Sequence, residues 1–163
     1  MATTKQAALK QIDPASPAVL SVDLFTQDFQ NAFKVFDPQK PLVVISEGLI
    51  NYFNKDLLKQ LIQSIANYGQ GFKALHYLTD LYPEPVKNKL AAVIWNSSKL
   101  LKLMSRSAFT FHFISPEQVR HFISEAGFKK VEVIQPRLYF NPDHQQNPEE
   151  HHGDLVWVVD AQL

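Results

Sequence analysis

The sequence predicts an α/β fold in which a mostly parallel sheet is covered by helices and closed by an antiparallel strand pair. Three observations predict this fold. Short apolar runs alternate with helix-length amphipathic stretches over most of the chain. One run, Pro41–Ser46, is apolar almost throughout, as in a parallel strand buried on both faces. Two strand-like runs end the chain without a helix between them. With 163 residues, the chain is expected to form a single domain over residues 1–163.

The amino-terminal half is expected to contain three strands and one helix. Ala18–Asp23 is a short run with β-branched residues and predicts the first strand. Pro41–Ser46 predicts the second, and Phe72–Leu78 predicts the third. The helix lies between the second and third strands. Asn54 is its expected N-cap, and the glycines that end with Gly71 are expected to stop it.

The carboxyl-terminal half is expected to contain two helices and two strands. An apolar stripe over residues 84–104 predicts a long helix. Ser115–Gln118 is a helix start signal, with an N-cap Ser, Pro at the first position and Gln three residues on. Gly127 should close this second helix. Val131–Leu138 and Leu155–Val159 predict the last two strands, joined by a polar segment.

Charge and composition exclude several functions. The 16 Lys and Arg balance 16 Asp and Glu and are scattered, so we expect no nucleic-acid partner and no membrane surface. Without Cys there is no disulfide, thiolate metal site or Cys nucleophile. No apolar run is long enough to span a bilayer, and Met1–Gln6 lacks the apolar core of a signal peptide. The expected localisation is cytoplasmic.

A metal site is the weaker interpretation of the histidines. The densest group of metal-ligating residue types lies in the polar segment Asp143–His152. It has no helical His-x-x-x-His pair or other fixed ligand frame, and it is rich in Asn, Pro, Gln and Glu. A solvated loop is therefore the preferred interpretation, and no metal is expected.

Ligands of open α/β sheets bind at the carboxyl ends of the strands, which draws attention to two short segments. Asp23 and Leu24 follow the first expected strand, and Glu47 and Gly48 follow the second. A carboxylate there can accept hydrogen bonds from a ribose, an adenine amino group or a ligand ammonium, while Gly48 lets the backbone approach a ligand closely. The alternative, equally weighted on these residues, is that both carboxylates cap the following turns.

These residues also carry a resemblance to a known family. Val22–Leu24, followed by Asp37–Phe53, resembles the leucine carboxyl methyltransferase family of class I S-adenosylmethionine-dependent methyltransferases. The most specific part is a Pro, an apolar strand, Glu-Gly, two apolar residues and a nearby Tyr. Gly127-Phe128 and the final strand fit less specifically. The resemblance implies a Rossmann-like methyltransferase sheet, with S-adenosylmethionine as the methyl donor.

The resemblance also implies roles for single residues. Asp23 and Leu24 would lie at the adenine of the donor, and Glu47 with Gly48 would lie at its methionine portion. Tyr52 would wall the pocket between donor and acceptor. The acceptor would be a small-molecule or peptide carboxylate or hydroxyl. His112, within the aromatic alternation Phe109–Phe113, would line an acceptor pocket. The preferred alternative is that this segment is part of the core and covers the long helix, because the 12 Phe of the chain must mostly serve packing.

The resemblance covers only the carboxyl-terminal portion of such an enzyme. Only 22 residues precede Asp23, and none of them is Gly, so the family's Gly-rich donor-binding turn has no counterpart. We therefore expect a truncated methyltransferase that binds its donor weakly alone. The first strand should pair with the second, or another chain should fill the exposed edge, as a homo-oligomer or a complementing chain. The alternatives are a non-catalytic remnant, a partner-completed α/β binding module, or an unrelated α/β domain.

Overall fold

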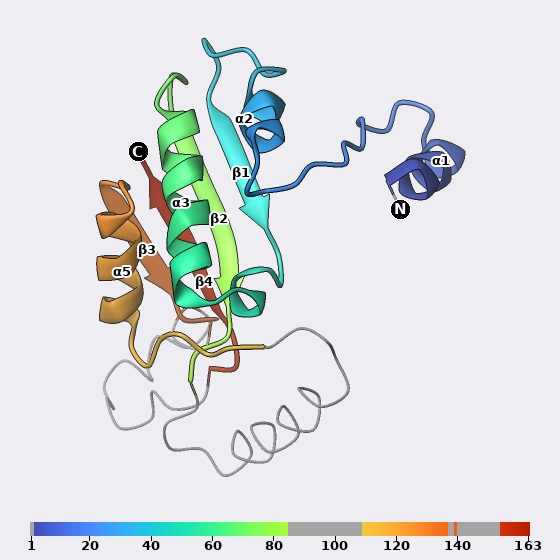
Figure 1. Ribbon diagram of the computed structural model, residues 1–163. Helices are drawn as coiled ribbons and strands as arrows, with labels where there is room; N and C mark the ends of the chain where they lie inside the picture. The colour runs from blue at the N-terminus through green and yellow to red at the C-terminus, as the bar shows by residue number, and fades with distance from the viewer. Residues whose placement is uncertain (1, 85–108, 137–138, 140–153) are drawn as a thin grey trace. The chain divides into compact units, whose positions relative to one another are not determined.

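A computed structural model describes residues 2–84, 109–136, 139 and 154–163 (Figure 1). The chain divides into two compact units, Met1–Asp37 and Pro38–Leu163, and each is described by itself. The prediction of a single domain over the whole chain stays a prediction. The long helix expected over residues 84–104 and the polar segment Asp143–His152 lie outside the described residues, except for Glu84.

In the unit Met1–Asp37, the described residues 2–37 form two helices and no strand. These are α1 (Ala2–Ile12) and α2 (Gln27–Phe33). The strand predicted at Ala18–Asp23 is wrong, because these residues form no regular structure. β-branched residues favour the extended backbone only weakly. A strand also needs a neighbouring strand that pairs with its backbone N–H and carbonyl groups. Here Val19 instead donates its N–H to the side chain of Gln6 on α1, which also donates to the Pro17 carbonyl at 3.2 Å.

The unit Pro38–Leu163 is built on a four-stranded mixed sheet. Its strands are β1 (Leu42–Ser46), β2 (Leu75–Leu81), β3 (Lys130–Ile134) and β4 (Trp157–Gln162), in the order β1-β2-β4-β3. β1 and β2 are parallel, whereas β4 lies antiparallel to both β2 and β3. The predicted α/β class and the closing antiparallel pair are therefore confirmed. β2 and β4 lie two to three residues further along the chain than predicted, and β3 ends earlier.

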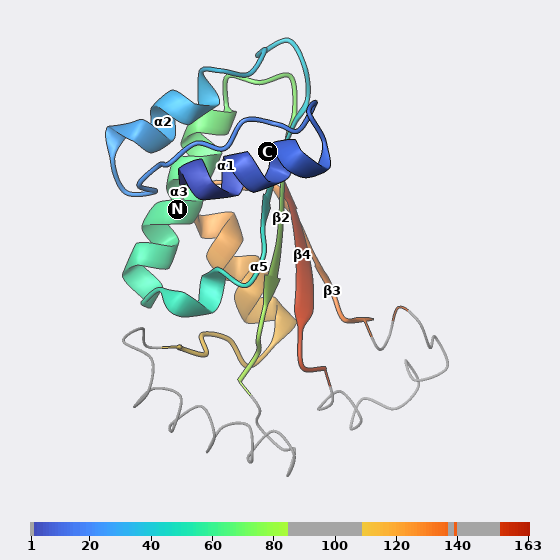
Figure 2. The same ribbon diagram turned by 90° about the vertical axis from the view of Figure 1, so that its right-hand side faces the viewer.

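Two helices, α3 (Lys55–Gly69) and α5 (Pro116–Glu125), cover one face of this sheet (Figures 1 and 2). In β2 and β4 every second side chain is buried, on the face that the helices cover. The core therefore lies between the sheet and the two helices. The largest fully enclosed core side chains come from α3, α5, the two central strands and the segment between β1 and α3: Tyr77, Ile50, Leu58, Leu61, Ile62, Leu75, Leu81, Ile123, Val119 and Val159.

The predicted helix boundaries are confirmed by cap geometry. The Asn54 side chain accepts a hydrogen bond from the Leu57 N–H at 2.8 Å, which caps α3. Ser115 caps α5 in the same way, through the Gln118 N–H at 3.4 Å. Gly127 follows α5 with a φ of 117°, a backbone conformation that favours glycine.

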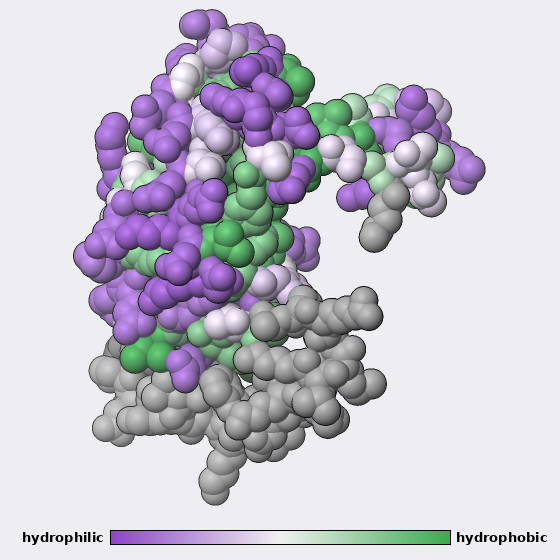
Figure 3. Space-filling model, in the orientation of Figure 1, coloured by the Kyte–Doolittle hydropathy of each residue, from purple (hydrophilic) through white to green (hydrophobic). Residues whose placement is uncertain are grey.

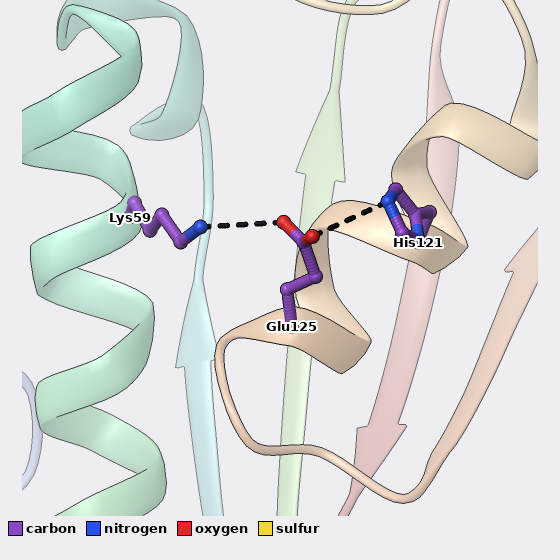
Figure 4. A network of polar contacts seen from close by, with 3 residues as sticks. All are labelled: Lys59, His121 and Glu125. Carbon is purple, nitrogen blue, oxygen red and sulfur yellow. Dashed lines mark hydrogen bonds and ion pairs between the residues drawn. The ribbon is translucent and has the colours of Figure 1, made fainter.

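An exposed ionic network joins the two helices at the surface (Figure 4). Glu125 on α5 contacts the Lys59 ammonium of α3 at 3.2 Å and the His121 Nε2 of its own helix at 3.3 Å. Pairs this exposed contribute at most about 1 kcal/mol each. The helices are therefore held against the sheet mainly by their apolar faces.

β1 is at one edge of the described sheet. Its Val43 and Ile45 point to the face opposite the helices and are 52% and 71% exposed. Figure 3 shows hydrophobic surface along the course of β1. The expected pairing of Ala18–Asp23 with this strand is wrong, since those residues form no strand. Filling of this edge by another chain stays a prediction. Within the described residues, no helix is both long and apolar enough to cross a membrane.

Candidate functional site

The carboxyl ends of β1 and β2 meet at one end of the sheet, because the two strands are parallel. Ser46, the last residue of β1, is opposite Thr79 of β2 in the register. Its hydroxyl lies 2.7 Å from the Thr79 hydroxyl and 2.9 Å from the Tyr77 hydroxyl. Burial raises the pKa of the Tyr77 phenol, so this group stays protonated. The contacts among these hydroxyls hold the ends of β1 and β2 in their observed register.

The turn after β1 carries the predicted pair Glu47 and Gly48. Gly48 has a φ of 61°, and its N–H donates to the Asp80 carboxylate of β2 at 2.7 Å. A Cβ added at Gly48 would meet no atom within 4 Å, so this stretch of backbone borders open space. Glu47 is exposed beside it. The turn therefore combines an accessible carboxylate with backbone that a ligand can approach.

Asn51 holds the next segment in place. It lies in η1 (Ile50–Tyr52), a short 3-10 helix after the turn, and is only 2% exposed. Its amide nitrogen donates to the carbonyls of Tyr82 and Thr110, at 3.1 and 2.8 Å, and its amide oxygen accepts the Tyr82 N–H at 2.9 Å. The Asn51 carbonyl accepts the Thr110 N–H at 2.7 Å. Three segments that meet at this end of the sheet are thus tied together by one residue.

Four aromatic side chains from the same segments form a continuous group, which we call the aromatic cluster: Tyr52, Tyr82, Phe109 and Phe111. Phe109 is its centre, and its ring centroid lies 5.2 to 5.6 Å from the other three, all in edge-to-face geometry. Tyr52 is 50% exposed, which gives the cluster an accessible side. The predicted wall residue Tyr52 is therefore at this end of the sheet, packed against the segment that contains His112.

His112 is half-buried next to η1 and the start of α3. Its Nε2 is enclosed by protein and has no hydrogen-bond partner. Burial is the largest effect and lowers the pKa of the imidazole, the nearby carbonyls of Phe53 and Ile50 raise it, and the charge of Lys55 lowers it. The ring is therefore neutral at pH 7. Its position is compatible with both sequence interpretations, an acceptor-pocket residue and a packed core residue.

Asp23 and Leu24 belong to the other unit. The prediction that Asp23 and Leu24 follow a strand is wrong, because residues 18–23 form no strand. The Asp23 carboxylate accepts the Phe25 N–H at 2.9 Å, and its carbonyl accepts the Thr26 hydroxyl at 3.1 Å. This is the turn-capping role given as the alternative for Asp23. A donor-binding role for either residue stays a prediction.

Asn51, Asp80 and Tyr82 are parts of this site that the sequence did not identify. Asp80 and Tyr82 lie at or just after the true end of β2, which the sequence placed three residues too early, at Leu78. A correct strand end would have included both residues in the strand-end argument. Asn51 had no such signal, since nothing in the residues around it shows that its amide is buried.

No protein-family model matches the sequence, and no curated protein matches it. Solved structures do match. A candidate methyltransferase from Thermobifida fusca aligns with a TM-score of 0.63 at 15% identity, over 98% of this chain and 58% of its own. Magnesium protoporphyrin IX methyltransferase from Synechocystis aligns with a TM-score of 0.53 at 12% identity, over 99% and 59%. A SAM-dependent methyltransferase from Archaeoglobus fulgidus gives 0.52 at 11%, over 96% and 72%.

These similarities define the fold class. The chain has the Rossmann-like fold of the SAM-dependent methyltransferases. It spans less than two thirds of the Synechocystis and Thermobifida chains. The predicted methyltransferase fold is therefore confirmed.

Proposed function

We propose that the chain is an S-adenosylmethionine-dependent O-methyltransferase of the leucine carboxyl methyltransferase type, acting on a carboxylate or hydroxyl acceptor. The observation that carries this proposal is the Glu47-Gly48 turn, which lies at the carboxyl end of a parallel strand in a sheet of methyltransferase fold. Ligands of open α/β sheets bind at this end. The sequence resemblance and the strand-end rule both favour this turn.

The residues present fit part of the donor. S-adenosylmethionine supplies a methyl group on a sulfonium, and it also carries an ammonium. The exposed Glu47 carboxylate would attract that positive charge. The backbone at Gly48 would border the methionine portion, since open space adjoins it. Methyl transfer then mainly requires that donor and acceptor are held in line, which Tyr52 and its aromatic neighbours would support.

A second candidate function is a non-catalytic module whose sheet is completed by another chain. The exposed Val43 and Ile45 on β1 favour it, because an apolar edge strand is a ready pairing surface. Self-association that depends on protein concentration, measured by analytical ultracentrifugation, would support this candidate. A Val43→Lys, Ile45→Lys double variant should then be more monomeric at the same concentration.

Calorimetric titration with S-adenosylhomocysteine tests the enzyme proposal directly. We expect weak but measurable binding by the full chain, since it has no counterpart of the Gly-rich turn, and about tenfold weaker binding by Glu47→Gln, which corresponds to the loss of one charge-assisted contact. Glu132→Gln is the matched control, because Glu132 is also exposed but lies within β3, away from the turn. Asp23→Asn tests the adenine role separately. A chain that is folded by circular dichroism and releases no heat with the ligand would contradict the proposal.

A further inference from the structure

The pairing of β1 with β2 ends at a side chain. In a parallel pair, alternate residues of one strand bond to the backbone of the neighbouring strand, and Leu42 begins this alternation by donating its N–H to the Ala74 carbonyl at 2.9 Å. Gly48 is the next residue of the same alternation after Ser46. Its N–H instead donates to the Asp80 carboxylate, at 2.7 Å. The side chain of Asp80 therefore replaces a backbone partner where the chain leaves β1.

Asp80 is held firmly by its own strand. β2 is a central strand of the sheet, paired with β1 on one side and with β4 on the other, where Val158 lies opposite Asp80. Glu47 and Gly48, by contrast, lie beyond the last pair of the β1–β2 ladder. A carboxylate on a fixed strand thus reaches a turn that is not itself part of the sheet, and fixed supporting residues are what a precise binding site requires.

The Asp80 contact holds the turn in the direction that it takes. Gly48 has a φ of 61°, so the backbone leaves the extended conformation directly after Glu47. Within the part of the chain that the structure describes, no other hydrogen bond joins Glu47 or Gly48 to β2. The bond to the carboxylate is short, and hydrogen bonds of this kind are roughly twice as strong as neutral ones. The position of the Glu47 carboxylate therefore depends on Asp80.

We propose that Asp80 is a positioning residue for the methyl donor. By accepting the Gly48 N–H, its carboxylate keeps the Glu47 carboxylate and the Gly48 backbone where the methionine portion of S-adenosylmethionine is proposed to bind. This inference rests on the proposed methyltransferase function and deepens it, since it names the residue on which the donor-binding turn depends. Asp80 acts on the donor only through this turn.

The same contact determines what the turn can offer a ligand. The Gly48 N–H is already used, so the turn presents acceptors, above all the exposed Glu47 carboxylate, beside the open space at Gly48. The ammonium of the donor can use an acceptor, whereas the carboxylate of the donor cannot. A turn that is ordered before the donor arrives also spares the complex the cost of ordering it. Loss of the Asp80 contact should therefore weaken donor binding.

Two variants of Asp80 test the hydrogen bond without any ligand. Asp80→Asn keeps a side-chain oxygen that can accept the Gly48 N–H, whereas Asp80→Ala does not. In amide hydrogen exchange followed by nuclear magnetic resonance, Gly48 should exchange at least about tenfold faster in Asp80→Ala than in Asp80→Asn. Both replacements are uncharged, so the difference reports the hydrogen bond and not the charge. Equal exchange rates at Gly48 would overturn the proposal.

Titration with S-adenosylhomocysteine, followed through the amide resonances of the full chain, tests the effect on the donor. Asp80→Ala should weaken binding by about tenfold, and Asp80→Asn by less than about threefold. Asp160→Ala is the matched control and should bind as the wild type does. The Asp160 carboxylate also makes side-chain contacts, to Gln162 at 3.1 Å and to His76 Nδ1 at 3.2 Å, but away from the turn. An Asp80→Asn variant as weak as Asp80→Ala would overturn the proposal, because the charge would then be responsible.

A double variant tests whether Asp80 acts through Glu47. Asp80→Ala should weaken S-adenosylhomocysteine binding by about tenfold in the wild type but by no more than about threefold when Glu47→Gln is already present, because the positioned residue has then lost its charge. Two losses that multiply in full would indicate independent effects and overturn this proposal, while the methyltransferase proposal would survive. If a folded wild-type chain binds no S-adenosylhomocysteine, the proposed function itself fails, and the role of Asp80 in donor binding fails with it.

Discussion

Replacing Asn51 by Ala should lower the free energy of unfolding by about 3 kcal/mol. The Asn51 side chain is buried and makes three hydrogen bonds, to the N–H and the carbonyl of Tyr82 and to the carbonyl of Thr110. Truncation removes the partner of each group. A buried polar group without a partner costs about 1 to 3 kcal/mol, and the lower value applies where water enters the space that the amide leaves. Three such groups give the stated magnitude.

Urea unfolding followed by circular dichroism measures this change, with Asn67→Ala as the matched control. Asn67 is exposed on α3, so its replacement should change the free energy of unfolding by no more than about 0.5 kcal/mol. Asn51→Asp makes the test more specific. It keeps the acceptor for the Tyr82 N–H but places a carboxylate against two carbonyls, which raises the pKa of the introduced group. Its stability deficit should therefore shrink as the pH falls from 7 to 4.

Two results would refute this reasoning. The first is an Asn51→Ala variant as stable as Asn67→Ala, which would mean that the three backbone groups find other partners. The second is a deficit in Asn51→Asp that does not change with pH. Either result would show that Asn51 does not hold the three segments together.

Three further predictions concern single positions. Gly69→Ala should destabilise the fold by about 1 to 3 kcal/mol, because the new Cβ would lie 2.2 Å from the Leu75 side chain, whereas Gly71→Ala meets nothing within 4 Å and should not. Ser115→Ala should cost about 1 kcal/mol through loss of the α5 cap, measured by thermal unfolding. The pKa of His112 is lowered in the folded state, so its contribution to stability is present above its ordinary value of 6.5 and is lost as the pH falls below it. His112→Gln should flatten this decline in melting temperature between pH 7.5 and 5.5; an unchanged slope would contradict the assignment.

The helices α3 and α5 were predicted well because their signals are local. Asn54 and Ser115 each cap a helix through a backbone N–H three residues ahead, so the start of the helix is determined by adjacent residues. The strands were predicted less well because pairing is not local. Ala18–Asp23 has a strand-like composition but forms no strand, and β2 extends to Leu81, three residues beyond the prediction. In β2 the end is set by β4, whose Trp157 pairs with Leu81.

The same contrast explains which part of the site could be predicted. Glu47 and Gly48 directly follow a strongly apolar strand, so the strand-end rule identified them from sequence alone. Asn51 and His112 have roles that depend on contacts between segments about 60 residues apart. An Asn after a strand is common, and so is a His among Phe residues, and only the fold shows that one amide is saturated and one imidazole nitrogen is not.

This difference between the two residues decides how their variants should be interpreted. Asn51 has every side-chain hydrogen-bonding atom in use, so its loss should change stability first and any activity only through the positions of Tyr82 and Thr110. The Nε2 of His112 is enclosed without a hydrogen-bond partner, so His112→Gln should change the melting temperature at pH 7.5 by less than Asn51→Ala does. A loss of melting temperature in His112→Gln as large as in Asn51→Ala would instead indicate that the imidazole is as important as the amide for the packing of this end of the sheet.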